Sequence, residues 1–278
     1  MKSDEILAIS KIEDLLRLAD AKDIDILVDY LTDNGEGRLS LDSSVCKHLV
    51  HCKKNSSYSL HDLGMIAKEI RLFGGNSLFN LIRSDGVPYD EIVKDVATHQ
   101  KVNFNKVDSI ASIEQEILAK ILTRALEEMP ENERRAVFDD LGITDYTLAG
   151  PAATAAILMT AKLGGFATYK LATMVAHSIA RAILGRGLAF GATAPLMKSI
   201  SIMIGPIGWA ATALWTAFDL ASPAYRVTMP CIVQLAYIRQ KAVLASSTTT
   251  CRRCKELKPV NAKFCPNCGA EKPFTLKP

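Results

Sequence analysis

Apolar residues recur every three or four positions through the first 145 residues. This spacing predicts a series of amphipathic helices, clearest in the stretches 24–31, 60–73 and 110–122. The helix that carries the apolar stripe over 110–122 is expected to end near Pro130, and we expect the charged residues of this stretch to lie on the opposite face. Because no stretch shows the alternation typical of strands, we predict an all-α, multi-helix body.

The chain changes character after residue 145, where charges become sparse and glycine and alanine frequent. Residues 199–218 form the longest uncharged run, and at about 1.5 Å per residue they are just long enough to cross a hydrocarbon core of about 30 Å. The sequence Gly205-Pro206-Ile207-Gly208 interrupts this run, so a hairpin of two short helices fits as well as one span.

Three interpretations of this apolar helical half stay open. It is a core wrapped by the acidic helices, a segment that enters a membrane conditionally, or a permanent transmembrane domain. Lys162, Lys170, Arg181 and Arg186 interrupt the earlier apolar stretches, and a charge near the middle of a bilayer costs a few kcal/mol or more. These residues weigh against the permanent transmembrane domain.

The formal net charge of +3 conceals a strong division along the chain. Residues 1–145 hold 18 Lys and Arg against 27 Asp and Glu, a charge of −9, whereas the remainder holds 15 against 3, a charge of +12. Opposite charges predict that the two halves attract each other. A basic apolar half also suits an anionic membrane surface. The alternative to both interpretations is that two domains simply differ in composition.

Four cysteines near the end of the chain form two Cys-x2-Cys pairs, Cys251 with Cys254 and Cys265 with Cys268, separated by ten residues. This spacing predicts a zinc ribbon, in which two tight turns present four thiolates to one tetrahedral Zn²⁺. Four protein ligands leave no position for water, so the zinc would be structural. Iron and a disulfide pair are weaker alternatives. The neighbouring basic residues would offset the negative charge of the thiolates: Arg252, Arg253, Lys255, Lys258 and Lys263.

These features predict four parts: an acidic helical domain over 1–145, an apolar basic helical region over 146–244, a polar linker over 245–250 and the ribbon over 251–278. No apolar segment typical of a secretory signal follows Met1. The remaining cysteines are three, an odd number that fits a reducing compartment: Cys46, Cys52 and Cys231. We therefore expect a cytoplasmic protein, with peripheral or conditional association with the inner membrane as the alternative.

The segment 40–54 gathers four further potential ligands, Cys46, His48, His51 and Cys52. On one helix they point over more than one face, and only His48 with His51 and His48 with Cys52 are neighbours one turn apart. The sequence alone therefore does not favour a metal site here. His177 stands in an apolar stretch and is expected to face the interior.

Several longer stretches resemble the bacterial YaaW-like proteins. The similarity runs from about Leu15 to Gln240, and its motifs are Phe73-Gly74-Gly75-Asn76-Ser77, Ile113-Glu114-Gln115-Glu116, and Ala224-Tyr225-Arg226-Val227-Thr228-Met229-Pro230 with Gln234. The resemblance implies an α-helical fold loosely similar to that of ubiquinol–cytochrome c chaperones. It supplies no catalytic residues to assign in this chain, and the ribbon looks like an addition found in some members.

We expect the protein not to be an enzyme, because Gly74-Gly75-Asn76 lacks the lysine and spacing of a phosphate-binding loop and no histidine stands near a nucleophile at a meaningful spacing. The leading hypothesis is an interaction or assembly protein, similar to a chaperone, whose apolar half engages a membrane or a hydrophobic client while the ribbon docks a protein partner. The alternatives are a membrane-active effector restrained by the acidic helices and, third, an undetected enzyme. Nucleic acid is a weaker candidate partner, since beside Phe264 the ribbon offers no stacking platform. A ribbon that only stabilises the protein is the remaining alternative.

Overall fold

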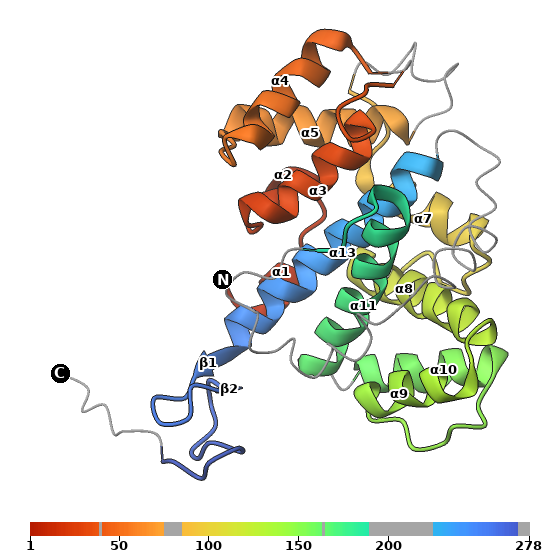
Figure 1. Ribbon diagram of the computed structural model, residues 1–278, viewed down its shortest axis with the longest axis vertical. Helices are drawn as coiled ribbons and strands as arrows, with labels where there is room; N and C mark the ends of the chain where they lie inside the picture. The colour runs from red at the N-terminus through yellow and green to blue at the C-terminus, as the bar shows by residue number, and fades with distance from the viewer. Residues whose placement is uncertain (39–40, 75–84, 163–164, 189–224, 272–278) are drawn as a thin grey trace.

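Helix α13 (Tyr225–Ser247) runs through the middle of the molecule and organises the fold (Figure 1). The computed structural model describes residues 1–38, 41–74, 85–162, 165–188 and 225–271. Every residue from 227 to 240 is buried, so α13 meets neighbouring helices on all sides. A helix that is buried on every side is stable only inside a core, and the other helices supply that core.

The helices on one side of α13 come from the start of the chain and are α1 (Ser3–Leu7), α2 (Ile12–Leu16), α3 (Ala21–Thr32), α4 (Ser43–Lys54) and α5 (Leu60–Phe73). The helices on the other side are α7 (Tyr89–His99), α8 (Ile110–Glu127), α9 (Glu131–Leu141), α10 (Gly150–Lys162) and α11 (Phe166–Leu184). Most of these helices contact α13 directly, whereas α4 packs on α3, α9 on α11, and α10 on α8 and α11. Two short strands, β1 (Thr248–Thr250) and β2 (Leu257–Pro259), follow α13 as an antiparallel pair. The predicted all-α body with a small cysteine ribbon is confirmed.

The ends of the helices follow local sequence signals. Ser59 and Asp62 form a reciprocal capping box at the start of α5, and the Ser109 hydroxyl accepts a hydrogen bond from the backbone of Ser112 at the start of α8. Gly142 and Gly185 end α9 and α11 in the left-handed conformation that glycine adopts without strain.

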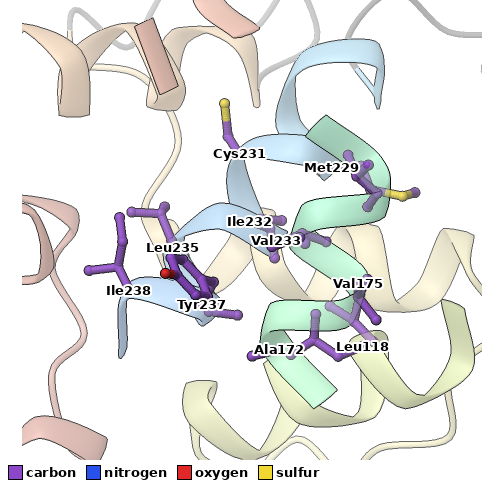
Figure 2. Close-up of a cluster of buried hydrophobic side chains, with 14 of the residues drawn as sticks. Leu118, Ala172, Val175, Met229, Cys231, Ile232, Val233, Leu235, Tyr237 and Ile238 are labelled. Carbon is purple, nitrogen blue, oxygen red and sulfur yellow. The ribbon is translucent and has the colours of Figure 1, made fainter. Parts of the chain in front are cut away.

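The apolar side chains of α8, α11 and α13 form the centre of the core (Figure 2). Leu118 of α8, Val175 of α11 and Ile232 of α13 are each at most 3% exposed. The predicted stripe of α8 is confirmed, since its isoleucines at 113, 117 and 121 are all buried. Burying apolar surface of this kind contributes about 25 cal/mol per Å².

One charged residue of that stripe does not lie where the sequence suggested. Glu114 is fully buried, and its two carboxylate oxygens accept hydrogen bonds from Arg239 of α13 at 2.7 and 2.9 Å. The hydroxyl of Tyr89 on α7 donates a third hydrogen bond, at 2.7 Å. Although burial lowers the pKa of Arg239, the nearby Glu114 carboxylate raises it above its ordinary value. The expectation that the charges of 110–122 face outward is thus wrong for Glu114, because a buried arginine compensates it.

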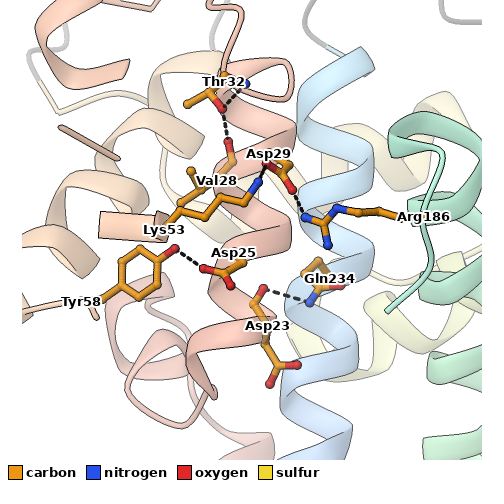
Figure 3. A network of polar contacts seen from close by, with 10 residues as sticks. Asp23, Asp25, Val28, Asp29, Thr32, Lys53, Tyr58, Arg186 and Gln234 are labelled. Atoms are coloured by element: carbon orange, nitrogen blue, oxygen red, sulfur yellow. Dashed lines mark hydrogen bonds and ion pairs between the residues drawn. The ribbon is translucent and has the colours of Figure 1, made fainter. Parts of the chain in front are cut away.

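Other ion pairs also join the acidic first half to the basic second half. Asp29 of α3 is 1% exposed and pairs with Arg186, which follows α11, and, within the first half, with Lys53 of α4 (Figure 3). Lys241 of α13 pairs with Asp23 at 2.8 Å and with Asp20 at 2.6 Å. Across the described residues, the two halves therefore pack against each other, as their opposite charges predicted.

The uncharged stretch 199–218, on which the membrane interpretations depend, lies outside the described residues. Among the helices that the structure does describe, none combines the length and the apolar character needed to cross a membrane. Helices α11 and α13 are largely buried in the core, so for these two segments the core interpretation is the one observed.

We expect Arg239→Met to destabilise the body by about 3–5 kcal/mol, because it leaves the Glu114 carboxylate buried without its counter-charge. Urea unfolding followed by far-ultraviolet circular dichroism measures the change. The matched control is Arg135→Met, which removes an ion pair with Glu131 whose side chains are 55% and 64% exposed and should cost less than about 1 kcal/mol.

A double variant distinguishes the cost of an uncompensated buried charge from the cost of altered packing. Arg239→Met combined with Glu114→Leu should recover most of the stability lost in the single variant, since no charge is then left uncompensated in the core. A single variant within about 1 kcal/mol of the wild type would show that the pair does not hold the core together.

Candidate metal centre

The four cysteines stand on a small ribbon that projects from the end of α13 (Figure 1). Strand β1 pairs with β2 in the register Thr248 with Pro259 and Thr250 with Leu257. The first cysteine pair lies in the turn between the two strands, and a bridge between Phe264 and Glu271 closes the second. The pairing thus brings two tight turns, separated by ten residues in sequence, to face each other.

All four sulfur atoms lie within 4.8 Å of one another. The Sγ atoms of Cys251 and Cys268 are 3.7 Å apart, and those of Cys254 and Cys265 are 3.6 Å apart. A tetrahedral ion with metal–sulfur bonds of about 2.3 Å separates its ligands by about 3.8 Å. The cluster that the sequence predicted is therefore assembled, and its donor set and spacing are compatible with zinc.

The two turns have the same backbone design. The N–H of Lys255 donates to the carbonyl of Cys251, and the N–H of Gly269 donates to the carbonyl of Cys265, both at 2.9 Å. Lys255 and Gly269 each follow the second cysteine of a pair, and both have a positive φ, of 62° and 67°. This left-handed residue turns the chain so that amide groups point at the sulfurs, as the glycine after Cys268 suggested.

These amides change the chemistry of the first pair. The backbone N–H groups of Cys254 and Arg253 lower the pKa of the Cys251 thiol to about 6, and the N–H of Glu256 lowers the pKa of Cys254. A thiol must lose its proton to bind a metal, and both shifts favour the thiolate.

The surface of the ribbon combines positive charge with two exposed apolar side chains. Arg252, Arg253, Lys255 and Lys263 are exposed, whereas Lys258 is buried. Phe264 is 57% exposed and Val260 is 38% exposed. The basic residues therefore lie where they can offset the charge of four thiolates and also contact a partner.

The ribbon joins the body differently from the linker predicted over 245–250. Residues 245–247 form the last turn of α13 and residues 248–250 form β1. The N–H of Val260 donates to the carbonyl of Ser247 at 2.9 Å, and the hydroxyls of Ser246 and Ser3 are hydrogen-bonded. Serine and threonine suit a linker by composition, but here their hydroxyls donate back to the carbonyls of the helix end, including Thr248 to Leu244 at 2.7 Å.

His177 lies in the interior, as its apolar surroundings suggested. It is 9% exposed, its Nδ1 accepts a hydrogen bond from the backbone of Leu188 at 3.2 Å, and burial lowers its pKa. A methyl group at Gly187 would meet the imidazole ring at 2.0 Å, so the residue is packed against the end of its own helix. This environment is that of a structural histidine.

The sequence of the chain is similar to those of known bacterial proteins. It is 43% identical over 182 residues to a UPF0174 protein of Helicobacter pylori, an alignment that covers 65% of this chain and 72% of the relative. The chain belongs to the UPF0174 family. A second UPF0174 protein of that bacterium is 38% identical over 63% of the chain and 87% of its own length.

The UPF0174 protein YaaW of Escherichia coli is 26% identical to the chain, over 76% of the chain and 85% of the relative. The membership that the sequence motifs suggested is thus confirmed. No family model and no solved structure matches the chain. The names of these UPF0174 proteins state no activity, ligand or partner, so the likeness to ubiquinol–cytochrome c chaperones stays a prediction.

Proposed function

We propose that the protein acts by binding and that its ribbon, folded around one structural Zn²⁺, is a docking module for a partner protein. The observation that carries this proposal is the continuous passage from α13 into β1, which fixes the ribbon to the core of the body. A rigid binding surface loses less conformational entropy on association than a flexibly tethered one.

The chemistry of the ribbon surface indicates the kind of partner. Exposed aromatic and arginine side chains are the residue types that contribute most at protein interfaces, and Phe264, Arg252 and Arg253 supply them here. We therefore propose a protein partner that offers an apolar pocket for Phe264 and an acidic rim. Zinc in this role holds the two turns together and takes no part in chemistry, because four thiolates complete its coordination.

The metal of the ribbon gives one test of this proposal. Protein purified under reducing conditions and dialysed against metal-free buffer should retain about one zinc per chain. Cys265→Ser should lose this zinc, while the helical content of the body is kept, because α13 is buried independently of the ribbon. Elemental analysis and circular dichroism measure both outcomes, with Cys46→Ser as the control thiol outside the ribbon.

Docking of a partner protein at the ribbon gives another test. A photoreactive phenylalanine analogue at position 264 should yield a discrete, protease-sensitive adduct in cells, whereas the same analogue at Val107, which is 92% exposed on the body, should not. Arg252→Glu with Arg253→Glu should reduce the adduct, and the control reversals Lys101→Glu with Lys106→Glu should not, since only the first pair lies on the ribbon.

Equal adducts at positions 264 and 107, or an adduct that is sensitive to nuclease and not to protease, would contradict protein docking. Loss of the adduct in Cys265→Ser would tie docking to the folded ribbon.

A second candidate function rests on the sequence of 199–218, a run of twenty uncharged residues interrupted by Gly205-Pro206-Ile207-Gly208. We propose that this segment engages a membrane or a hydrophobic client. In a variant of this proposal, the protein is a membrane-active effector and the acidic helices restrain the segment. The basic residues Arg186 and Lys198 precede the segment and suit an anionic surface, and Arg186 reaches such a surface once its ion pair with Asp29 is broken.

Liposome flotation with anionic lipid tests this candidate, at neutral pH and after mild acid or salt has weakened the ion pairs between the halves. The wild type should float with the vesicles, and Ile204→Asp or Trp209→Asp should abolish flotation while the zinc content is unchanged. A wild type that stays with the soluble fraction under every condition would rule out membrane engagement.

A further inference from the structure

A second group of metal-ligating side chains lies where α4 meets α5. His48 and Cys52 stand one turn apart on the same face of α4, and Asp62 extends toward them from the first turn of α5. The ligand atoms of these three side chains all lie within 4.8 Å of one another. Sequence spacing could suggest the first two residues, but only the packing of the two helices adds the carboxylate.

The distances fit a tetrahedral ion with little adjustment. Cys52 Sγ is 3.5 Å from His48 Nε2, and a metal with bonds of about 2.3 Å to sulfur and 2.0 Å to nitrogen separates such ligands by about 3.5 Å. Asp62 Oδ1 is 2.7 Å from the same Nε2, a hydrogen-bond distance that has to widen by about 0.6 Å when a metal replaces the proton.

The surroundings hold these ligands in place. The second oxygen of Asp62 accepts hydrogen bonds from the backbone N–H of Ser59 at 2.7 Å and from its hydroxyl at 2.8 Å, so the first oxygen is directed at His48. Partners of this kind orient metal ligands in known sites. Cys52 is 7% exposed, whereas the His48 side chain is 45% exposed, which leaves a path for an ion from solvent.

The same contacts argue against a nucleophilic cysteine. A thiol activated by a histidine and a carboxylate needs one ring nitrogen for each partner. Here a single nitrogen, Nε2, faces both Cys52 and Asp62. That arrangement suits three ligands converging on one ion.

We propose that His48, Cys52 and Asp62 form a second metal site, which takes a zinc-like first-row divalent cation. Imidazole, thiolate and carboxylate are donors that such ions accept, and the thiolate and carboxylate together balance the two positive charges. Three protein ligands bind less tightly than the four thiolates of the ribbon, so this site fills when metal is added and is emptied by dialysis. Occupancy joins α4 to α5 by coordination at the point where they meet.

The test uses Co²⁺ as the probe on the full chain, with the zinc of the ribbon retained. One equivalent of Co²⁺ should produce thiolate-to-cobalt absorption in the near ultraviolet and tetrahedral bands in the visible. His48→Ala should reduce both to the background, and the exposed position of this side chain keeps the fold intact. The matched control is His51→Ala, one turn away on α4 and also exposed, which should bind Co²⁺ as the wild type does.

Two further measurements separate this site from the ribbon. Cys52→Ala should remove the near-ultraviolet band, whereas Cys46→Ala, a second buried cysteine of α4, should keep it. A zinc indicator should report no release during the titration. Absorption that persists in His48→Ala, or that rises in step with released zinc, would assign the cobalt to the ribbon, and a wild type without these bands would overturn the proposal.

Discussion

The buried ion pair between Arg239 and Glu114 is the contact on which the arrangement of the helices depends. The guanidinium donates to both carboxylate oxygens and, through a third nitrogen, to the carbonyls of Ile6 and Ile9 at 2.9 Å. One side chain of α13 therefore fixes α8 and the end of α1, and Tyr89 adds α7 through the same carboxylate. Since a buried charge is tolerated only when it is paired and hydrogen-bonded, a shift of α13 along its axis would break all these contacts at once.

The same principle extends to the charge division of the chain. In the inter-half pairs of the described residues, the acid comes from the first 145 residues and the base from the remainder, as in Asp29 with Arg186 and Asp23 with Lys241. Separate halves with charges of −9 and +12 would each suffer internal repulsion, which packing relieves. The composition of each half is thus explained by the fold, at least where the partners are described.

Features that depend on neighbours in sequence could be predicted, whereas those that depend on packing could not. The stripe of α8 and the cysteine ribbon follow from spacing alone, and both are observed. Glu114 was assigned to the outer face because no pattern within one helix reveals that Arg239, 125 residues later, will pair with it. Asp62 was missed for the same reason, since its sequence signal is that of a helix cap and its position beside His48 is set by the tertiary arrangement of α4 and α5, which both pack on α3.

The connection between body and ribbon also follows from packing. A stretch of serine and threonine without tertiary contacts is a flexible linker, but here residues 245–247 extend α13, in which every position from 227 to 240 is buried. Helix growth adds one hydrogen bond for each residue fixed, so a helix already anchored in the core continues through residues of modest propensity. The ribbon consequently takes its orientation from Arg239 and the buried face of α13. This dependence supports a docking role. A ribbon that only stabilised the protein would gain nothing from a fixed orientation, whereas a binding surface that is already held rigid loses less conformational entropy when the partner binds, and therefore binds more tightly.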